Sequence, residues 1–159
     1  MIDVIFAFKF IHVLAAGVML GGWCCVALFM VLAHRSRNTA VVALTAQFVV
    51  RAEWTLVLAA IVLLPVSGFP LAYAIGIAPF GEWWSELSLV IYVVVAVSWV
   101  AALAIELRIR RIARQAALDA IVLPDAYRRL FRVWCALAVP VLVGMVAIYA
   151  LMIWQPRFD

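Results

Sequence analysis

Residues 10–33 of the chain read FIHVLAAGVMLGGWCCVALFMVLA, and this stretch decides the fold. Its only strongly polar side chain is that of His12. An α-helix rises about 1.5 Å per residue, so about 20 apolar residues cross the hydrocarbon core of a bilayer. Because the run is continuous and does not alternate between apolar and polar residues, it predicts a transmembrane helix rather than a strand of a membrane barrel.

Three further apolar runs follow the first one, at residues 54–78, 87–105 and 133–154. Of the 159 residues, 70% are hydrophobic, whereas a soluble domain is about half apolar. A globule of this size cannot bury so much apolar surface, so lipid must cover the excess. The sequence therefore predicts an all-α integral membrane four-helix bundle. We expect one transmembrane domain over residues 1–159, with helices at about 4–33, 41–77, 85–113 and 125–154.

The arginines predict the orientation of the four helices. Ten of the twelve basic residues fall in or beside the two links that follow the first and third runs: Arg35, Arg37, Arg51, Arg108, Arg110, Arg111, Arg114, Arg128, Arg129 and Arg132. Loops rich in arginine and lysine stay in the cytoplasm. We therefore expect both termini outside and two hairpins closed by cytoplasmic links. Lipid headgroups are sufficient partners for these charges, and no nucleic-acid-binding module is visible.

Prolines lie inside the second predicted helix and at the start of the fourth. The stretch LPVSGFP at residues 64–70 places Pro65 and Pro70 near the middle of the second helix. Each proline removes the donor for the carbonyl four residues earlier, so we expect an interruption or kink there, with Ser67 replacing one lost hydrogen bond. Pro124 suits the start of a helix, which places the beginning of the fourth helix near it.

His12 is the first candidate for chemistry, because polar groups inside a bilayer are costly and are often functional. A neutral imidazole binds haem iron well, and a four-helix bundle can hold haem between its helices. We expect haem b with His12 as an iron ligand and Met152 of the fourth helix as the second, since His/Met ligation is known. Gly17 and Gly21 would allow close packing of a helix or flat cofactor. The alternative is that His12 bonds to a neighbouring helix and that Met152 only fills space.

A second polar set lies toward the arginine-rich side, where we expect a cluster of Arg51, Glu53, Glu106 and Arg132. Arg51 and Glu53 are two residues apart and do not face each other on a helix. We therefore expect pairs between helices, such as Glu106 with Arg51 or Glu53 with Arg132, that clamp the two hairpins together. A proton-relay role is the alternative for this cluster.

Several motifs occur in an order that resembles a known family. They are KFIHVL at residues 9–14 with glycines at 21 and 22, RAEW at 51–54, the Pro65-x-x-Gly68 pattern and Pro124-x-x-Tyr127 ahead of Trp134. Together they resemble the bacterial integral membrane proteins catalogued as domain of unknown function 2269, over nearly the whole chain. The resemblance implies a multi-pass protein of the bacterial inner membrane and no assigned activity.

The first helix also resembles, more distantly, HemJ-type protoporphyrinogen oxidases and copper-resistance-D-like membrane domains. Those proteins carry an early histidine followed by a glycine-rich stretch, and in the HemJ type that histidine is thought to bind haem. Only His12 is carried over by this resemblance, because residues 19–23 read MLGGW where the HemJ type has Trp-Phe-Ala-Gly-Leu.

Three functions are left open by the sequence. The first is a b-haem-binding membrane protein with a redox or electron-relay role. The second is a non-catalytic accessory or assembly subunit, which packs as a homodimer or within a larger membrane complex. The third is a HemJ-like protoporphyrinogen oxidase. Cofactor-free enzyme chemistry is disfavoured, because we expect no Ser/His/Asp set, no carboxylate pair in the bilayer and no phosphate loop. If the protein is an enzyme, we expect a membrane haem-dependent oxidoreductase.

Overall fold

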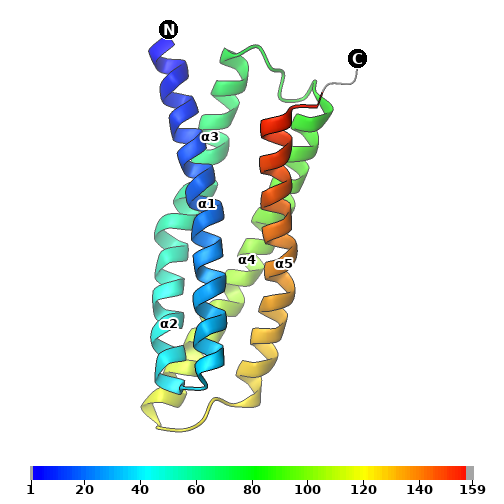
Figure 1. The fold of residues 1–159 in the computed structure, drawn as a ribbon. Coiled ribbons are helices and arrows are strands. Elements are labelled where there is room, and N and C mark those ends of the chain that lie inside the picture. Colours follow the sequence, from blue (N-terminus) through cyan, green and yellow to red (C-terminus); the bar gives the residue numbers. More distant parts are fainter. Residues whose placement is uncertain (1, 157–159) are drawn as a thin grey trace.

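The computed structural model describes residues 2–156 and consists of helices (Figure 1). In chain order they are α1 (Ile2–Ser36), α2 (Thr39–Ala52), the π-helix η1 (Glu53–Val57), α3 (Leu58–Ala74), α4 (Trp83–Leu118) and α5 (Asp125–Trp154). Because α2, η1 and α3 follow one another without a loop, the described residues form four helices long and apolar enough to cross a membrane. The predicted helix count and fold class are thereby confirmed.

Backbone capping explains where the helices end. Asn38 precedes α2, and its side-chain oxygen accepts hydrogen bonds from the backbone N–H groups of Ala40 (2.9 Å) and Val41 (3.2 Å). Ala120 follows α4 in the left-handed conformation (φ 53°), and the N–H of Ile121 reaches back to Ala116 O at 3.0 Å. This arrangement closes α4 at Leu118, five residues beyond the expected end at 113. Helix α5 starts directly after Pro124, as predicted.

The irregular part of the second span is not where the prolines predicted it. Helix α3 continues through Pro65 and Pro70, and the π-helical segment lies earlier, at residues 53–57. The carbonyl of Ile61, which loses its donor at Pro65, accepts the hydroxyl hydrogen of Tyr92 on α4 at 2.5 Å. Ser67 instead donates to Leu63 O at 2.5 Å, within its own helix. The expectation that Ser67 repairs a proline-orphaned carbonyl was therefore wrong.

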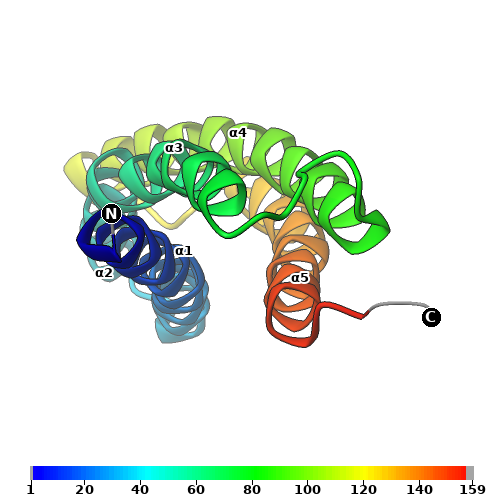
Figure 2. The same ribbon diagram turned by 90° about the horizontal axis from the view of Figure 1, so that it is seen from above.

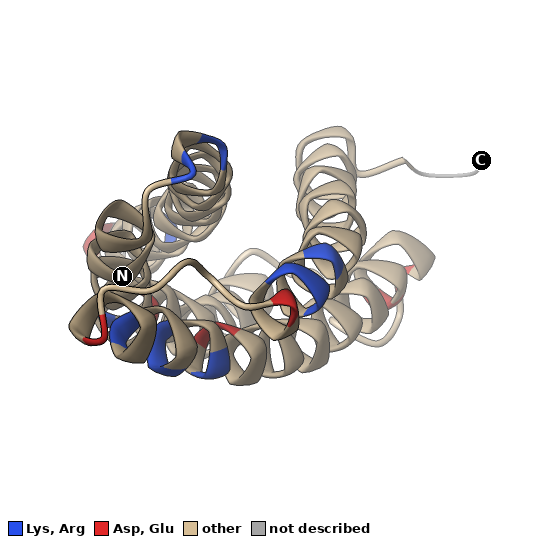
Figure 3. Cartoon of the chain, turned by 90° about the horizontal axis from the view of Figure 1, so that it is seen from below, with Lys and Arg blue, Asp and Glu red and all other residues tan. Residues whose placement is uncertain are grey.

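The helices form an arc, with α1 and α5 at its two ends (Figure 2). Helix α1 packs against α3 and α2, while α4 packs against α5 and α2. Gly144 allows the close approach of α5 to α4, because a Cβ there would lie 2.8 Å from Val95 Cγ2. The start of α1 and the end of α5 lie at one end of the bundle, and the α1–α2 and α4–α5 links lie at the other, which we call the arginine-rich end (Figures 1 and 3).

Most of the apolar surface of the spans is not covered by protein. Within the most apolar window of each span, only 17–28% of residues are buried inside the molecule. Large side chains such as Phe6 (69% exposed), Val97 (65%) and Ile153 (80%) point outward. Their number is far beyond the isolated apolar residues that a soluble surface carries, so lipid contact is required.

Candidate functional site

Two carboxyl groups lie in the apolar core of the helices. Glu53 is 0% exposed and Glu106 is 1% exposed, and Ser67 and Ser88 are the other polar side chains buried among the described residues. The serines bond to carbonyls within their own helices, at Leu63 and Trp84 respectively. The carboxyls are different, because each receives its hydrogen bond from another helix.

Glu53 is the first residue of the π-helical segment η1. Trp99 of α4 donates its indole N–H to Glu53 Oε2. The second oxygen, Oε1, is buried and has no hydrogen-bond partner. A π-helical turn inserts an extra residue into a helix and frequently marks a functional site, and here it carries a carboxyl into the core.

Glu106 lies seven residues after Trp99 on α4, which puts both side chains on one face of that helix. Trp134 of α5 donates its indole N–H to Glu106 Oε1 at 2.7 Å, and Oε2 has no partner. Because Trp99, which donates to Glu53, shares a face of α4 with Glu106, the two carboxyls lie on the same side of that helix. Helix α4 thus brings the two acids together, one as its own residue and one through Trp99.

Trp23 of α1 completes the group, which we call the carboxyl–tryptophan cluster: Glu53, Glu106, Trp23, Trp99 and Trp134. The rings of Trp23 and Trp134 stack with centroids 6.2 Å apart and planes within 5°. Trp23 is 0% exposed, and its indole N–H has no acceptor. Three buried polar atoms of the cluster are therefore unpartnered: one oxygen on each carboxyl and one indole nitrogen.

The predicted arginine partners of these carboxyls were wrong. Arg51 and Arg132 are exposed, whereas Glu53 and Glu106 are buried. Among residues 2–156, the only ion pair joins Asp125 and Arg128, at 3.7 Å. Arg51 stands two residues before Glu53, about 200° around the helix, so it points outward when Glu53 points inward. The tryptophan partners could have been sought from the sequence, since a buried indole N–H requires an acceptor.

His12 bonds to the neighbouring helix, which is the alternative that the sequence left open. Its Nδ1 lies 3.0 Å from Leu64 O and 3.2 Å from Ser67 Oγ. A carbonyl only accepts, so Nδ1 carries the hydrogen and Nε2 holds the lone pair. The ring rests on Gly68, where a Cβ would be 2.8 Å from His12 Cε1. In the sequence, the glycine of the Pro65-x-x-Gly68 pattern was the feature that could have indicated this contact, because it leaves room for the ring.

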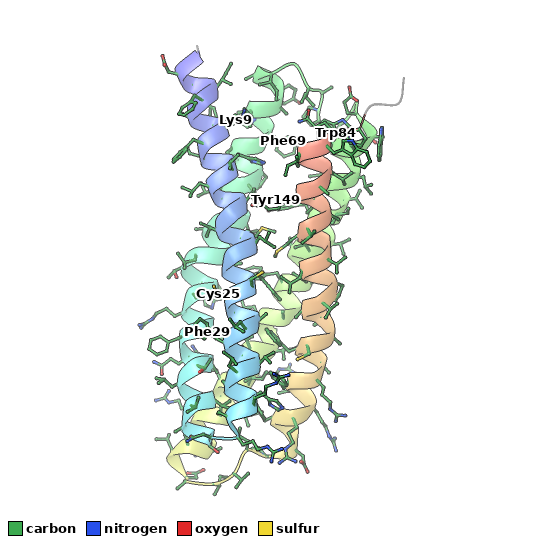
Figure 4. All side chains as sticks on the ribbon, in the orientation of Figure 1. Lys9, Cys25, Phe29, Phe69, Trp84 and Tyr149 are labelled. Carbon is green, nitrogen blue, oxygen red and sulfur yellow. The ribbon has the colours of Figure 1, made fainter. Side chains whose placement is uncertain are left out.

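The other predicted ligand and packing residues lie apart from this contact. Met152 is on α5, at the opposite end of the arc from the α1–α3 contact of His12, and is 38% exposed. The described contacts of His12 are with α3 and do not include Met152. Gly17 and Gly21 are exposed. Figure 4 shows Tyr149 reaching from α5 toward α1, and its hydroxyl would lie 4.0 Å from a Cβ at Gly17. A Cβ at Gly21 would have no neighbour within 4 Å.

The buried Glu53 and Glu106 give this arrangement groups for acid–base chemistry, and the expectation that the spans hold no carboxylate pair was wrong. No group of three or more His, Cys, Asp or Glu side chains forms a metal site within residues 2–156. The carboxyl–tryptophan cluster offers two acidic groups in an apolar interior, each of which can hold a proton.

Comparison with known proteins gives a family but no activity. No curated protein and no solved structure matches the chain. One family profile, described as predicted integral membrane protein (DUF2269), matches residues 6–156. With four membrane-spanning helices and a match over almost its whole length, the chain belongs to the DUF2269 family of predicted integral membrane proteins.

Proposed function

We propose that this protein binds an exchangeable proton at the Glu53–Glu106 pair, within a multi-pass protein of the bacterial inner membrane. One observation carries the proposal: both carboxyls are buried in the core, and neither forms an ion pair. Buried carboxyls of soluble proteins are usually matched by a cation, which this pair lacks.

The energetics favour a shared proton. An ionised carboxylate in a low-dielectric interior is very costly without a counter-charge, and a second one beside it adds repulsion. One indole donor for each carboxyl offsets only part of this cost. A proton held by the pair removes one charge and supplies an O–H donor. The unpartnered oxygens, Glu53 Oε1 and Glu106 Oε2, are the positions where this proton is held and exchanged.

Infrared spectroscopy of the protein in lipid nanodiscs tests the proposal. We expect a carbonyl stretching band of protonated carboxyl at neutral pH that shifts when the sample is moved into D₂O. The band should disappear in the Glu53→Gln/Glu106→Gln double variant. The control is Glu86→Gln, because Glu86 is an exposed residue in the first turn of α4, at the end of the bundle opposite the arginine-rich end. A wild-type spectrum without this band, or a band that resists D₂O, would refute an exchangeable proton.

Haem binding at His12 is a second candidate, supported by one contact. Because Nδ1 donates to Leu64 O, Nε2 is the unprotonated nitrogen, and this is the form that binds iron. The pairing of His12 on α1 with Met152 on α5 as two ligands of one haem stays a prediction. Haem bound through His12 would supply electron transfer, and a redox, electron-relay or HemJ-like oxidase role rests on it.

The visible absorption spectrum of purified protein tests the haem candidate. Protein expressed with ample haem should show a Soret band that is lost in His12→Ala and retained in Met152→Leu. A colourless wild-type protein would eliminate this candidate. The accessory-subunit role would then gain weight, and the exposed Gly17 and Gly21 positions are where such a partner would pack.

The orientation is part of the same proposal. The arginine-rich end is placed in the cytoplasm and the two chain ends outside, by the distribution of positive charge. Reporter fusions in the loops at Asn38 and Val122 should be active only as cytoplasmic reporters. A fusion at Gly81 should be active only as a periplasmic reporter. The opposite pattern would reverse the orientation.

A further inference from the structure

The arginine-rich end holds an open pocket of about 1020 Å³ between the end of α1, the start of α2 and the start of α5. Its lining is strongly basic, with five arginines and a single acidic residue: Arg35, Arg37, Arg128, Arg129, Arg132 and Asp125. Figure 3 shows these positively charged turns at the end of α1 and the start of α5. The pocket is separate from the carboxyl–tryptophan cluster, which none of its lining residues belongs to.

The positive charge of this pocket is not neutralised by the protein. Asp125 pairs with Arg128 at 3.7 Å, and this is the only ion pair among residues 2–156. The other four arginines of the lining, which come from α1, its C-terminal turn and α5, have no acidic partner. The positive-inside rule explains why arginines lie near the cytoplasmic ends of the helices. It does not explain why arginines from both hairpins line the same pocket.

Backbone and aromatic groups complete the pocket. Two helices begin at it, α2 at Thr39 and α5 at Asp125, and the N-terminus of a helix carries partial positive charge. On the deep side, His34 lies 3.0 Å from the hydroxyl of Tyr127 and stacks on Phe131 at 4.0 Å. These contacts hold the wall of the pocket, because Tyr127 and Phe131 are buried.

We infer that this pocket binds a phosphate-bearing ligand. Arginine guanidinium groups bind phosphate oxygens through paired N–H donors, and helix N-termini favour the same anions. Val122 and Leu123 give the lining an apolar side as well. The pocket lies where the apolar spans end, so the phosphate comes either from an anionic lipid headgroup or from a soluble phosphate compound. The two sources share one recognition chemistry and differ in how they reach the site.

A charge-matched pair of variants separates this site from general attraction to basic protein. Arg35→Gln/Arg132→Gln removes two pocket arginines from different helices, and both side chains are exposed, so the fold should persist. Arg110→Gln/Arg114→Gln removes the same charge from α4 at the same end of the molecule, outside the pocket. Equal melting temperatures of the two variants would show that both remain folded.

Two arms identify the source of the phosphate. In the lipid arm, native mass spectrometry counts dioleoyl-phosphatidylglycerol retained by the protein, with dioleoyl-phosphatidylcholine as reference. In the soluble arm, calorimetry measures inorganic pyrophosphate. We expect saturable binding in at least one arm, weakened about tenfold or more in Arg35→Gln/Arg132→Gln and unchanged in Arg110→Gln/Arg114→Gln. Equal weakening in both variants, or no saturable binding in either arm, would overturn the inference.

Discussion

The His12 contact and the carboxyl–tryptophan cluster are two polar groups inside the same apolar molecule, and they are completed differently. His12 meets a backbone carbonyl and a serine hydroxyl on the adjacent α3, and these three groups satisfy one another. The carboxyl–tryptophan cluster draws on α1, η1, α4 and α5, and it leaves three polar atoms unpartnered. The first arrangement is sufficient to explain helix packing alone. The second retains binding capacity that packing does not use.

Removal of the Trp134 side chain should have the largest effect on stability. Trp134 stacks on Trp23 and Phe131 and donates to Glu106, so Trp134→Ala removes a large buried ring and the hydrogen bond to a buried acid. We expect the free energy of unfolding in mixed micelles to fall by about 3–5 kcal/mol. The control is Trp154→Ala, since Trp154 is 79% exposed. Similar losses in both variants would mean that the cluster does not hold the helices together.

A methyl group at Gly68 should disturb the His12 contact specifically. The added Cβ would lie 2.8 Å from His12 Cε1, so the ring must move away from Leu64 O. We expect Gly68→Ala to lower the free energy of unfolding by about 1–3 kcal/mol. Gly21→Ala is the matched control, because nothing lies within 4 Å of its added Cβ and alanine favours the helix. If the His12→Ala background does not reduce the penalty at Gly68, the proposed clash is not its cause.

The Tyr92 hydroxyl should contribute a smaller amount. Tyr92→Phe removes the donor to Ile61 O, the carbonyl left free by Pro65. Hydrogen bonds between membrane helices contribute about 0.6 kcal/mol on average, and we expect a loss near that value. Tyr73→Phe provides the control, since Tyr73 is 68% exposed. An unchanged stability in Tyr92→Phe would indicate that the carbonyl finds another donor.

The smallest effect on stability is expected from the substitution that abolishes proton binding. An amide at position 53 or 106 keeps an oxygen that can accept the indole hydrogen bond of Trp99 or Trp134. It also removes a group that is costly to bury in charged form. We expect Glu53→Gln and Glu106→Gln each to change the free energy of unfolding by less than about 0.5 kcal/mol. A large loss in either variant would show that the carboxyl is needed for folding, and would weaken the case for a functional site.

Together, these variants decide whether the His12 contact and the carboxyl–tryptophan cluster differ as proposed. If the His12 contact is structural, its energetic losses should appear in unfolding measurements and not in the infrared carboxyl band. If the carboxyl–tryptophan cluster is functional, substitution of Glu53 and Glu106 should change the infrared carboxyl band and leave the free energy of unfolding nearly unchanged.

The four spans and the start of α5 at Pro124 could be predicted from the sequence, because they depend on local properties. An apolar run long enough to cross lipid must be helical, since lipid offers no partner for backbone groups. The π-helical segment at residues 53–57 could not be predicted, because no residue there lacks a donor or breaks a helix. In the structure this segment begins with Glu53, whose carboxyl meets Trp99 of α4.

The candidate site depended on tertiary structure for a related reason. The sequence singled out Glu53 and Glu106, since any acid near a bilayer is conspicuous, but it assigned them to arginines by charge. Arginine side chains at the surface are well solvated, so burying one beside a carboxyl in the core would gain little free energy. The indoles of Trp99 and Trp134 were already buried by their apolar rings, so they were the donors available there. Composition and hydropathy thus determined that the chain is a membrane protein, and only the packing of the helices determined which polar groups meet inside it.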